Sequence, residues 1–150
     1  MTSFADAIFR MPLTARPLHA GSARGRVLRL DEPLSFWGGT DLDGRIIDWH
    51  HPQCDESVAG TVLVMRSGRG SSSSSYVLTE QLRRGSGPVA IVLAEPDAIV
   101  TLGAIVADEL YGTAVPVAMV DAQDLAALRT GLEVTVECSG STGLVVPVAS

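Results

Sequence analysis

The 150-residue chain contains no lysine and no asparagine, and all eleven of its positively charged side chains are arginines. The missing lysine excludes a Schiff-base enzyme, a lysine general base and a Walker-type phosphate loop, because each of these needs a lysine amine. The net charge is -6, with 17 acidic residues, and no basic stripe is present that could follow a phosphate backbone. Nucleic-acid binding is therefore not expected.

Cysteine is scarce as well, because the chain contains only two, Cys54 and Cys138. They lie far apart in the sequence, and neither belongs to a CxxC motif. This spacing provides no disulfide framework and no metal knuckle, so reduced thiols are expected. No apolar run approaches the roughly 18 residues that a transmembrane helix needs. Asp6 and Arg10 interrupt the only apolar patch near the N-terminus, which argues against a signal peptide. We therefore expect a cytoplasmic protein that does not enter a membrane.

Aromatic residues make up only 5% of the chain, whereas 46% of its residues are hydrophobic. This composition and length predict one domain whose core is built mainly from Val, Leu, Ile and Ala. Residues 1–20 show weak periodicity and contain two prolines, so they predict an N-terminal arm or a short helix. Residues 21–150 form the predicted single domain.

From residue 61 onward, short apolar runs alternate with amphipathic stretches. The apolar runs are typical of strands buried on both faces, and the amphipathic stretches are typical of helices. The order strand, helix, strand, helix, strand predicts an α/β fold with a mostly parallel sheet and helical crossovers. The expected strands are 26–30, 45–49, 61–65, 88–94, 115–120 and 132–138, and the expected helices end at Arg84, span 98–110 and run from Asp121 to Arg129.

A glycine- and serine-rich loop at residues 67–75 lies between a buried strand and an amphipathic helix. The alternative is a flexible linker, but the order strand, glycine loop, helix collects free backbone N–H groups at the start of the helix. Gly68 and Gly70 let the backbone approach a ligand closely, and Arg69 adds a planar cation that suits a carboxylate or phosphate. We therefore predict an anion-binding site here, and the residues alone leave open which of serines 71–73 points into it.

A weak candidate for a metal site consists of His50, His51 and Cys54. Adjacent side chains on a strand point in opposite directions, so the two imidazoles cannot easily hold one ion. A turn stabilised by Pro52 and by imidazole hydrogen bonds is the favoured interpretation. Trp37 lies beside two glycines, and it predicts a packed loop anchor rather than a stacking platform.

Several motifs occur in order between residues 25 and 120. They are DEPLSFWGG at 31–39, HHP at 50–52, ESVAG at 56–60, SGRGSS at 67–72 and GAIVADELYG at 103–112. Together they resemble the swivel domain of the aconitase X family. The resemblance implies a swivelling β/β/α domain that closes over a larger catalytic part, which holds an iron or iron–sulfur centre. Because the chain ends at Ser150, we expect the small subunit of a two-chain enzyme, a heterodimer or a higher heteromer.

The resemblance also implies a division of labour between the two subunits. Ser71 matches the serine motif of the aconitase superfamily, which implies that Ser71 removes a proton from a small carboxylate substrate. The metal of the large subunit would act as a Lewis acid on the leaving hydroxyl, and domain closure would exclude water. This chain is expected to hold no metal itself. The residues implied to bind the anionic group of the substrate are Gly68, Arg69, Gly70 and Ser72.

Two substrates fit the two-chain members that the sequence resembles. Bacterial members are similar to cis-3-hydroxy-L-proline dehydratases, which give Δ1-pyrroline-2-carboxylate, and archaeal members are similar to mevalonate 5-phosphate dehydratases. A chain without lysine or asparagine is typical of a GC-rich genome, which favours the bacterial activity. The alternative from another class is a non-catalytic module whose loop binds a phosphate or carboxylate.

Overall fold

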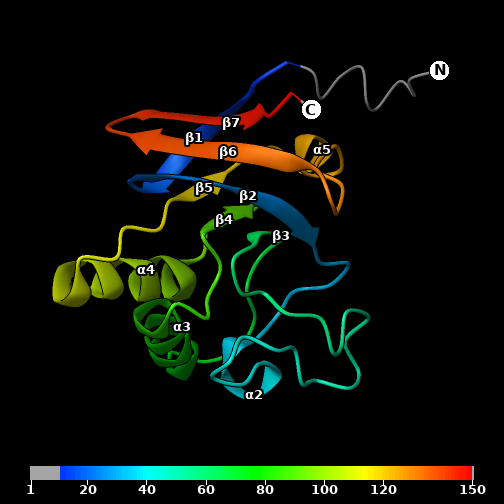
Figure 1. Cartoon of the computed structure of the whole chain (residues 1–150), viewed down its shortest axis with the longest axis vertical. Coiled ribbons are helices and arrows are strands. Elements are labelled where there is room, and N and C mark those ends of the chain that lie inside the picture. Colours follow the sequence, from blue (N-terminus) through cyan, green and yellow to red (C-terminus); the bar gives the residue numbers. More distant parts are fainter. Residues whose placement is uncertain (1–10, 150) are drawn as a thin grey trace.

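The computed structural model describes residues 11–149, in which seven strands form a closed barrel in the order β1-β5-β4-β3-β2-β6-β7 (Figure 1). Helices α3 and α4 lie on one side of the barrel, and the start of β1 and the end of β7 lie on the other side (Figure 1). The strands are β1 (Leu13–His19), β2 (Gly21–Arg29), β3 (Val62–Met65), β4 (Ala90–Leu93), β5 (Val117–Met119), β6 (Glu133–Ser139) and β7 (Thr142–Pro147), and the helices are α2 (Phe36–Gly39), α3 (Ser73–Arg84), α4 (Ala98–Tyr111) and α5 (Ala122–Leu125).

The barrel is mixed, so the predicted mostly parallel sheet is wrong, although the α/β class is confirmed. Strands β2, β3, β4 and β5 are parallel neighbours, and α3 and α4 are the predicted crossovers. Strand β1 is antiparallel to β5 and β7, and β6 is antiparallel to β2 and β7. Parallel neighbours need long connections, whereas the short turn after Ser139 lets β7 fold back beside β6. The antiparallel strands close the sheet into a barrel.

Two strands lie where the sequence predicted none. Residues 13–19, part of the predicted arm, form β1, in which Leu13 and Ala15 are buried while Thr14 and Arg16 are exposed. This is the alternation of a strand with one face toward the core. Residues 1–10 of the predicted arm lie outside the described residues. Strand β7 was not predicted either.

Two predicted elements are reduced in the structure. Residues 45–49 form no strand, and they contribute only isolated bridges from Arg45 to Ser57 and from Ile46 to Thr40. The last helix was predicted from Asp121 to Arg129 but covers only Ala122–Leu125, and the Asp121 side chain accepts no capping hydrogen bond. A helix without that cap loses one of the interactions that stabilise its first turn.

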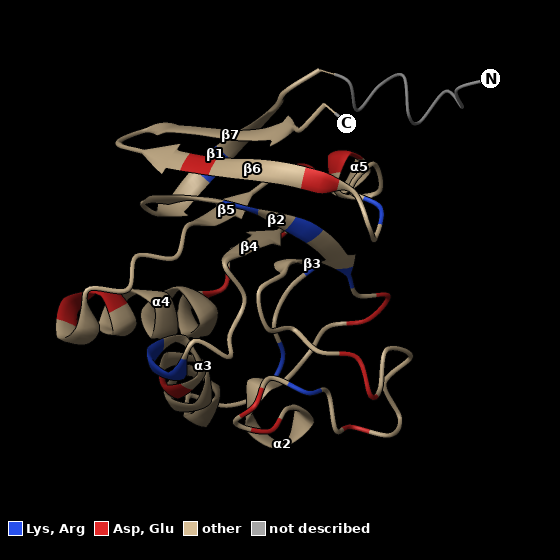
Figure 2. Ribbon diagram, viewed as in Figure 1, with Lys and Arg blue, Asp and Glu red and all other residues tan. Residues whose placement is uncertain are grey.

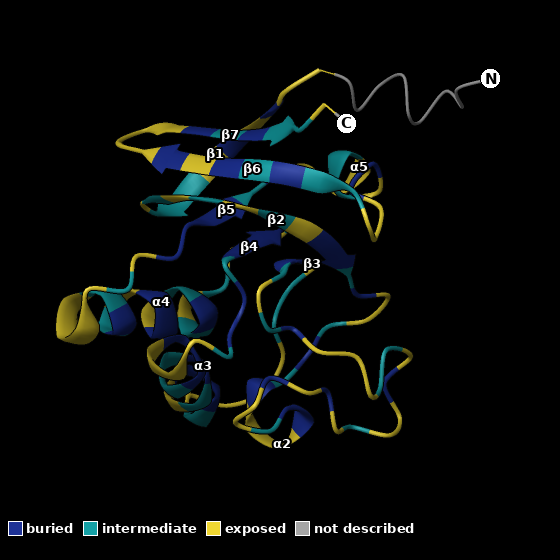
Figure 3. Cartoon of the chain, viewed as in Figure 1, coloured by how far each residue is buried: buried dark blue, intermediate teal, exposed yellow. Residues whose placement is uncertain are grey.

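Two groups of buried side chains form the core, one inside the barrel and one between the barrel and the helices. On β3, Val62 and Val64 belong to the first group, while Leu63 and Met65 belong to the second. Every residue of β3 and β4 is therefore buried (Figure 3). Burial on both faces explains the continuous apolar runs from which these strands were predicted.

Helices α3 and α4 are joined by two hydrogen bonds from hydroxyl groups. The Ser75 hydroxyl donates to the Ile99 carbonyl oxygen (2.6 Å), and the Thr79 hydroxyl donates to the Gly103 carbonyl oxygen (2.9 Å). Leu78, which lies between these two side chains on α3, is fully buried. The start of α3 is thus fixed against α4.

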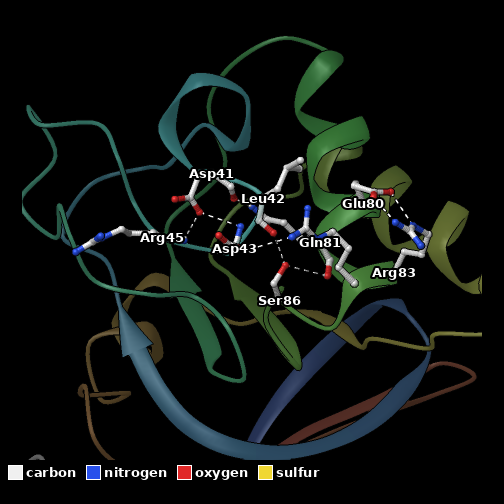
Figure 4. Close-up of polar contacts among 9 residues, drawn as sticks. Asp41, Leu42, Asp43, Arg45, Glu80, Gln81, Arg83 and Ser86 are labelled. Carbon is white, nitrogen blue, oxygen red and sulfur yellow. Dashed lines mark hydrogen bonds and ion pairs between the residues drawn. The ribbon is translucent and has the colours of Figure 1, made fainter.

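The loop between α2 and β3 is held by the C-terminal end of α3 (Figure 4). Gln81 is fully buried, and its Nε2 group donates to Thr40 Oγ1 and to the Asp41 carbonyl oxygen, each at 2.8 Å. The Ser86 hydroxyl donates to the Leu42 carbonyl oxygen at 2.6 Å. These bonds fix the start of the loop that leads into β3.

Charged side chains of both signs are interspersed over strands, loops and helices (Figure 2). Arg24 on β2 pairs with Glu133 on β6 (3.1 Å), and this hydrogen bond holds the pKa of the Glu133 carboxyl below its usual value. On α3, Arg83 does the same for Glu80, its neighbour one turn away. Within residues 11–149, no helix is long and apolar enough to cross a membrane.

Candidate functional site

The glycine–serine loop leaves the carboxyl end of β3 and enters α3 at Ser73. In both barrels and open sheets of α/β proteins, ligands commonly bind beyond the carboxyl ends of the parallel strands, so this loop occupies a common position for a site. A cavity of about 240 Å³ opens there, and Gly68, Arg69 and Gly70 form part of its wall. Ser74 and Asp97 supply the other polar groups of the wall, whereas Ser71 and Ser72 lie outside it.

Asp97 ties the loop to the start of α4. Its Oδ2 atom accepts a hydrogen bond from the Gly68 backbone N–H (2.9 Å). Its Oδ1 atom accepts from the backbone N–H groups of Ile99 (2.9 Å) and Val100 (3.0 Å), which caps the helix. The Gly68 N–H is therefore already engaged within the protein, and Gly68 contributes the shape of the loop rather than a free donor.

Both glycines of the loop are needed for close contacts with neighbouring side chains. A Cβ atom on Gly68 would lie 2.6 Å from Asp97 Oδ2. Gly70 has a φ of +114°, which side-chain-bearing residues rarely adopt, and a Cβ there would collide with the Ser35 hydroxyl. The loop can follow this path only with glycine at these two positions.

The structure separates the serines of the run into exposed and engaged groups. Ser71 and Ser72 are exposed, and neither their hydroxyls nor their backbone N–H groups bond to another residue within 11–149. Ser74 is buried, and its hydroxyl oxygen accepts from the Trp37 backbone N–H (3.2 Å). Ser75 is buried and bonded to α4. The exposed free hydroxyls thus belong to Ser71 and Ser72, and the half-buried Ser73 hydroxyl also bonds to no residue within 11–149. All three lie at the positive end of the helix dipole.

Arg69 lies beside these serines, and its guanidinium keeps donors available for a ligand. Its Nη2 atom is 3.7 Å from Asp48 Oδ2, which is an ion pair too long for a hydrogen bond. The Arg69 backbone N–H donates to the Leu34 carbonyl oxygen (3.0 Å), which fixes the backbone beneath the exposed side chain. Asp48 is held in turn, because its Oδ1 accepts from the His50 backbone N–H (3.0 Å).

His50, His51 and Cys54 do not form a cluster that could hold a metal ion. His51 is buried, its Nδ1 accepts from the Gln53 backbone N–H, and its Nε2 lies 3.0 Å from the Glu32 carbonyl oxygen, which fits the turn interpretation. Cys138 is buried near Val117, and burial raises the pKa of its thiol. In the part of the chain that the structure describes, no cluster of three or more His, Cys, Asp or Glu could hold a metal ion.

Residues 12–145, nearly the whole described chain, match the sequence model of the aconitase X swivel domain. The chain belongs to the aconitase X swivel domain family. The swivel domain is 32% identical to aconitase X of Thermococcus kodakaraensis in its holo-form, whose solved structure superposes with a TM-score of 0.79. The superposition covers 91% of this chain and 98% of that chain. The resemblance in the motifs is thereby confirmed.

Two kinds of relative are similar to the swivel domain. A cis-3-hydroxy-L-proline dehydratase of Pseudomonas aeruginosa is 47% identical over 107 residues, which cover 71% of this chain and 18% of that protein. A phosphomevalonate dehydratase small subunit of Thermococcus kodakarensis is 36% identical over 128 residues, which cover 85% of this chain and 90% of that protein. The swivel domain therefore spans about a fifth of the first relative and nearly all of the second.

Sequence reasoning missed Asp48 and Asp97, the two carboxylates that hold the loop. An aspartate immediately before an apolar helix is a typical N-cap, so the capping role of Asp97 had a readable signal. The hydrogen bond between Asp97 and Gly68 had no such signal in the sequence, because the two residues lie 29 positions apart. The same holds for Asp48 and Arg69, which only the fold brings together.

Replacing Asp97 with alanine is expected to lower the free energy of unfolding of the swivel domain by about 2–3 kcal/mol, because one helix cap and the Gly68 bond are lost together. Asp97→Asn is the matched control, since its remaining carbonyl oxygen can serve either the cap or the loop and should lose about half as much. Urea denaturation of both variants measures the difference. Equal stability of Asp97→Ala and the wild type would contradict the role assigned to this carboxylate.

Proposed function

We propose that this swivel domain is the small subunit of a metal-dependent hydro-lyase, which dehydrates cis-3-hydroxy-L-proline to Δ1-pyrroline-2-carboxylate. The 47% identity to the dehydratase of Pseudomonas aeruginosa supports this substrate. The observation that carries the proposal is the exposed Ser71, whose hydroxyl and backbone N–H are both free at the start of α3. A free hydroxyl in the positive electrostatic field at the start of a helix can serve as the group that removes a proton from a substrate.

Ser71 is the proposed base in this reaction. It removes the proton on the carbon next to the substrate carboxylate, that carbon and its neighbour form a double bond, and the hydroxyl leaves as water. A change of tautomer then gives the imine product. A serine hydroxyl is a weak base, but the N–H groups at the start of α3 and the Arg69 guanidinium lower the cost of its alkoxide.

The other residues of the loop bind and orient the substrate. Arg69 and the N–H groups of Ser71 and Ser72 face the carboxylate in this proposal, while Gly68 and Gly70 allow the close path of the backbone. An arginine suits a carboxylate because two of its N–H groups can bind the two oxygens together.

The remaining half of the active centre belongs to a large aconitase X subunit in this proposal. Nearly all of the small subunit of the Thermococcus kodakarensis dehydratase is matched by this chain, which supports a two-chain, heteromeric enzyme. The described residues offer no ligand set for the iron or iron–sulfur centre that the family implies, so we assign that centre to the large subunit. The cytoplasm, which keeps Cys54 and Cys138 reduced, is the proposed location.

Reconstitution with the large aconitase X subunit of the same genome tests the proposal. The complex is expected to convert cis-3-hydroxy-L-proline to Δ1-pyrroline-2-carboxylate, and neither subunit alone should do so. Mevalonate 5-phosphate is the second substrate to assay, because the match to 90% of a phosphomevalonate dehydratase small subunit favours it. A complex that dehydrates neither compound, while this chain alone binds carboxylate or phosphate, would replace the enzyme with a non-catalytic anion-binding module.

A further inference from the structure

Most of the aromatic side chains in the described part of this protein lie on its surface rather than in its core. Five aromatic residues fall within the described part of the chain, and only Phe36 is buried. The others are exposed to 61% (Trp37), 79% (Trp49), 84% (Tyr76) and 50% (Tyr111). Trp37 was predicted to be a packed anchor, and that prediction is wrong. Together these four residues are named the aromatic face below.

Three members of the aromatic face flank the glycine–serine loop. The Trp37 backbone N–H donates to Ser74 Oγ, and the Trp37 and Tyr76 side chains line one groove of about 310 Å³. Trp49 directly follows Asp48, whose carboxylate faces Arg69 at 3.7 Å. The rings of Trp37 and Tyr76 therefore lie beside the loop that carries Ser71, and Trp49, whose ring lies against His50, follows a residue that pairs with this loop.

The fourth member extends this surface along the two helices. Tyr111 and Tyr76 line a groove of about 730 Å³ between α4 and α3, together with the exposed Leu102 and Leu110. Ser72 and Ser73 line the same groove, so it begins one residue from Ser71. Apolar side chains at exposures of 48–66% do not stabilise the isolated fold, because water still covers them.

We propose that the aromatic face is the surface on which the large aconitase X subunit docks, with Trp49 and Tyr76 as its main anchors. This inference rests on the proposed function, since Ser71 can act only on a substrate that the large subunit brings to it. A partner that reaches Ser71 must also cover the rings beside that serine. Aromatic side chains are enriched at protein interfaces and carry much of their binding energy.

Two further observations favour this occupant. In the Pseudomonas aeruginosa dehydratase, the matching segment is only 18% of one protein, so most of that protein lies outside the segment. In this chain, the aromatic face lies on α2, α3, α4 and the loop between α2 and β3, and the start of β1 and the end of β7 lie on the opposite side of the barrel (Figure 1). A partner can therefore cover the aromatic face without meeting the start of β1 or the end of β7.

The affinity of the full chain for the large aconitase X subunit of the same genome tests the proposal. Trp49→Ala and Tyr76→Ala are each expected to raise the Kd at least about tenfold. Met11→Ala is the matched control, because Met11 is an apolar residue that is 69% exposed and lies two residues before the start of β1, away from the aromatic face. It should change the Kd less than about twofold. Thermal unfolding is expected to show all three variants folded, since all three side chains are exposed.

The outcomes separate the interface from the activity. Wild-type affinity in both Trp49→Ala and Tyr76→Ala would overturn the interface, even if the complex is an active dehydratase. A complex that depends on these rings but dehydrates neither substrate would overturn the proposed function and leave the interface standing. The alternative occupant of this surface is a second copy of the chain, and sedimentation of the isolated chain tests it. If the chain self-associates, if Tyr76→Ala abolishes this self-association, and if the affinity for the large subunit is unchanged, the surface would be assigned to a second copy.

Discussion

Ser71→Ala is expected to lower kcat of the reconstituted dehydratase about 100- to 10,000-fold, which is the usual contribution of a positioned general base. KM should change much less, because Arg69 and the N–H groups at the start of α3 remain in place. The free energy of unfolding and the affinity for the large subunit should also stay near the wild-type values. The Ser71 hydroxyl is exposed and bonds to no residue within 11–149, so its removal leaves no partner unsatisfied.

Ser72→Ala is the matched control for this experiment, since Ser72 is the neighbouring exposed serine with a free hydroxyl. A step of one residue at a helix start turns the side chain by about 100°, so both hydroxyls cannot face the same substrate atom. We expect the Ser72 variant to keep most of kcat and to bind the substrate more weakly. Full turnover in Ser71→Ala, together with a loss in Ser72→Ala, would move the base to Ser72.

Gln81→Glu is expected to destabilise the fold by about 3 kcal/mol or more at pH 7, because it places a carboxylate at a fully buried position. The amide of Gln81 donates to Thr40 Oγ1 and to the Asp41 carbonyl oxygen, and an ionised carboxylate can donate to neither. It would instead face the Asp41 carbonyl oxygen with a like partial charge. The loop between α2 and β3 should then detach first, since these bonds hold its start (Figure 4).

The pH dependence of stability distinguishes the charge from the lost hydrogen bonds. Burial raises the pKa of the introduced carboxyl in the folded state above its unfolded value of about 4.3. The folded state then binds more protons, so stability falls as pH rises above about 4 and the loss is small below it. Gln81→Met removes the two bonds without adding charge, and it should cost about 1–3 kcal/mol at every pH. Guanidinium denaturation at pH 4 and pH 7 makes the comparison, and equal losses for both variants at pH 7 would contradict the argument.

The elements between β3 and β5 were readable from the sequence because each carries a local signal. Strands β3 and β4 are continuous apolar runs since both of their faces are covered, and α3 ends at Arg84, as predicted. The glycine–serine loop stood out for the same reason, as its composition differs from the segments on either side. The family was also readable, because several short motifs occurred in order.

Other features had no local signal, because they depend on residues that are distant in the chain. The closure of the barrel requires β1 to pair with β7, about 130 positions later in the sequence. The separation of Ser71 and Ser72 from the engaged Ser74 and Ser75 depends on contacts with Trp37 and Ile99. Asp97 and Asp48 reach the loop in the same long-range way.

By itself, the sequence determined the helical crossovers and the position of the glycine–serine loop, because the spacing and composition of short windows indicate them. Its motifs, taken in order, resembled those of the family. Only the tertiary structure decided that the sheet closes into a mixed barrel, which serines keep free hydroxyls, and that four of the five described aromatic rings lie outside. The physical reason is that the exposure and the hydrogen bonds of a side chain depend on which other segment packs against it. A pattern within one segment cannot show which other segment covers it.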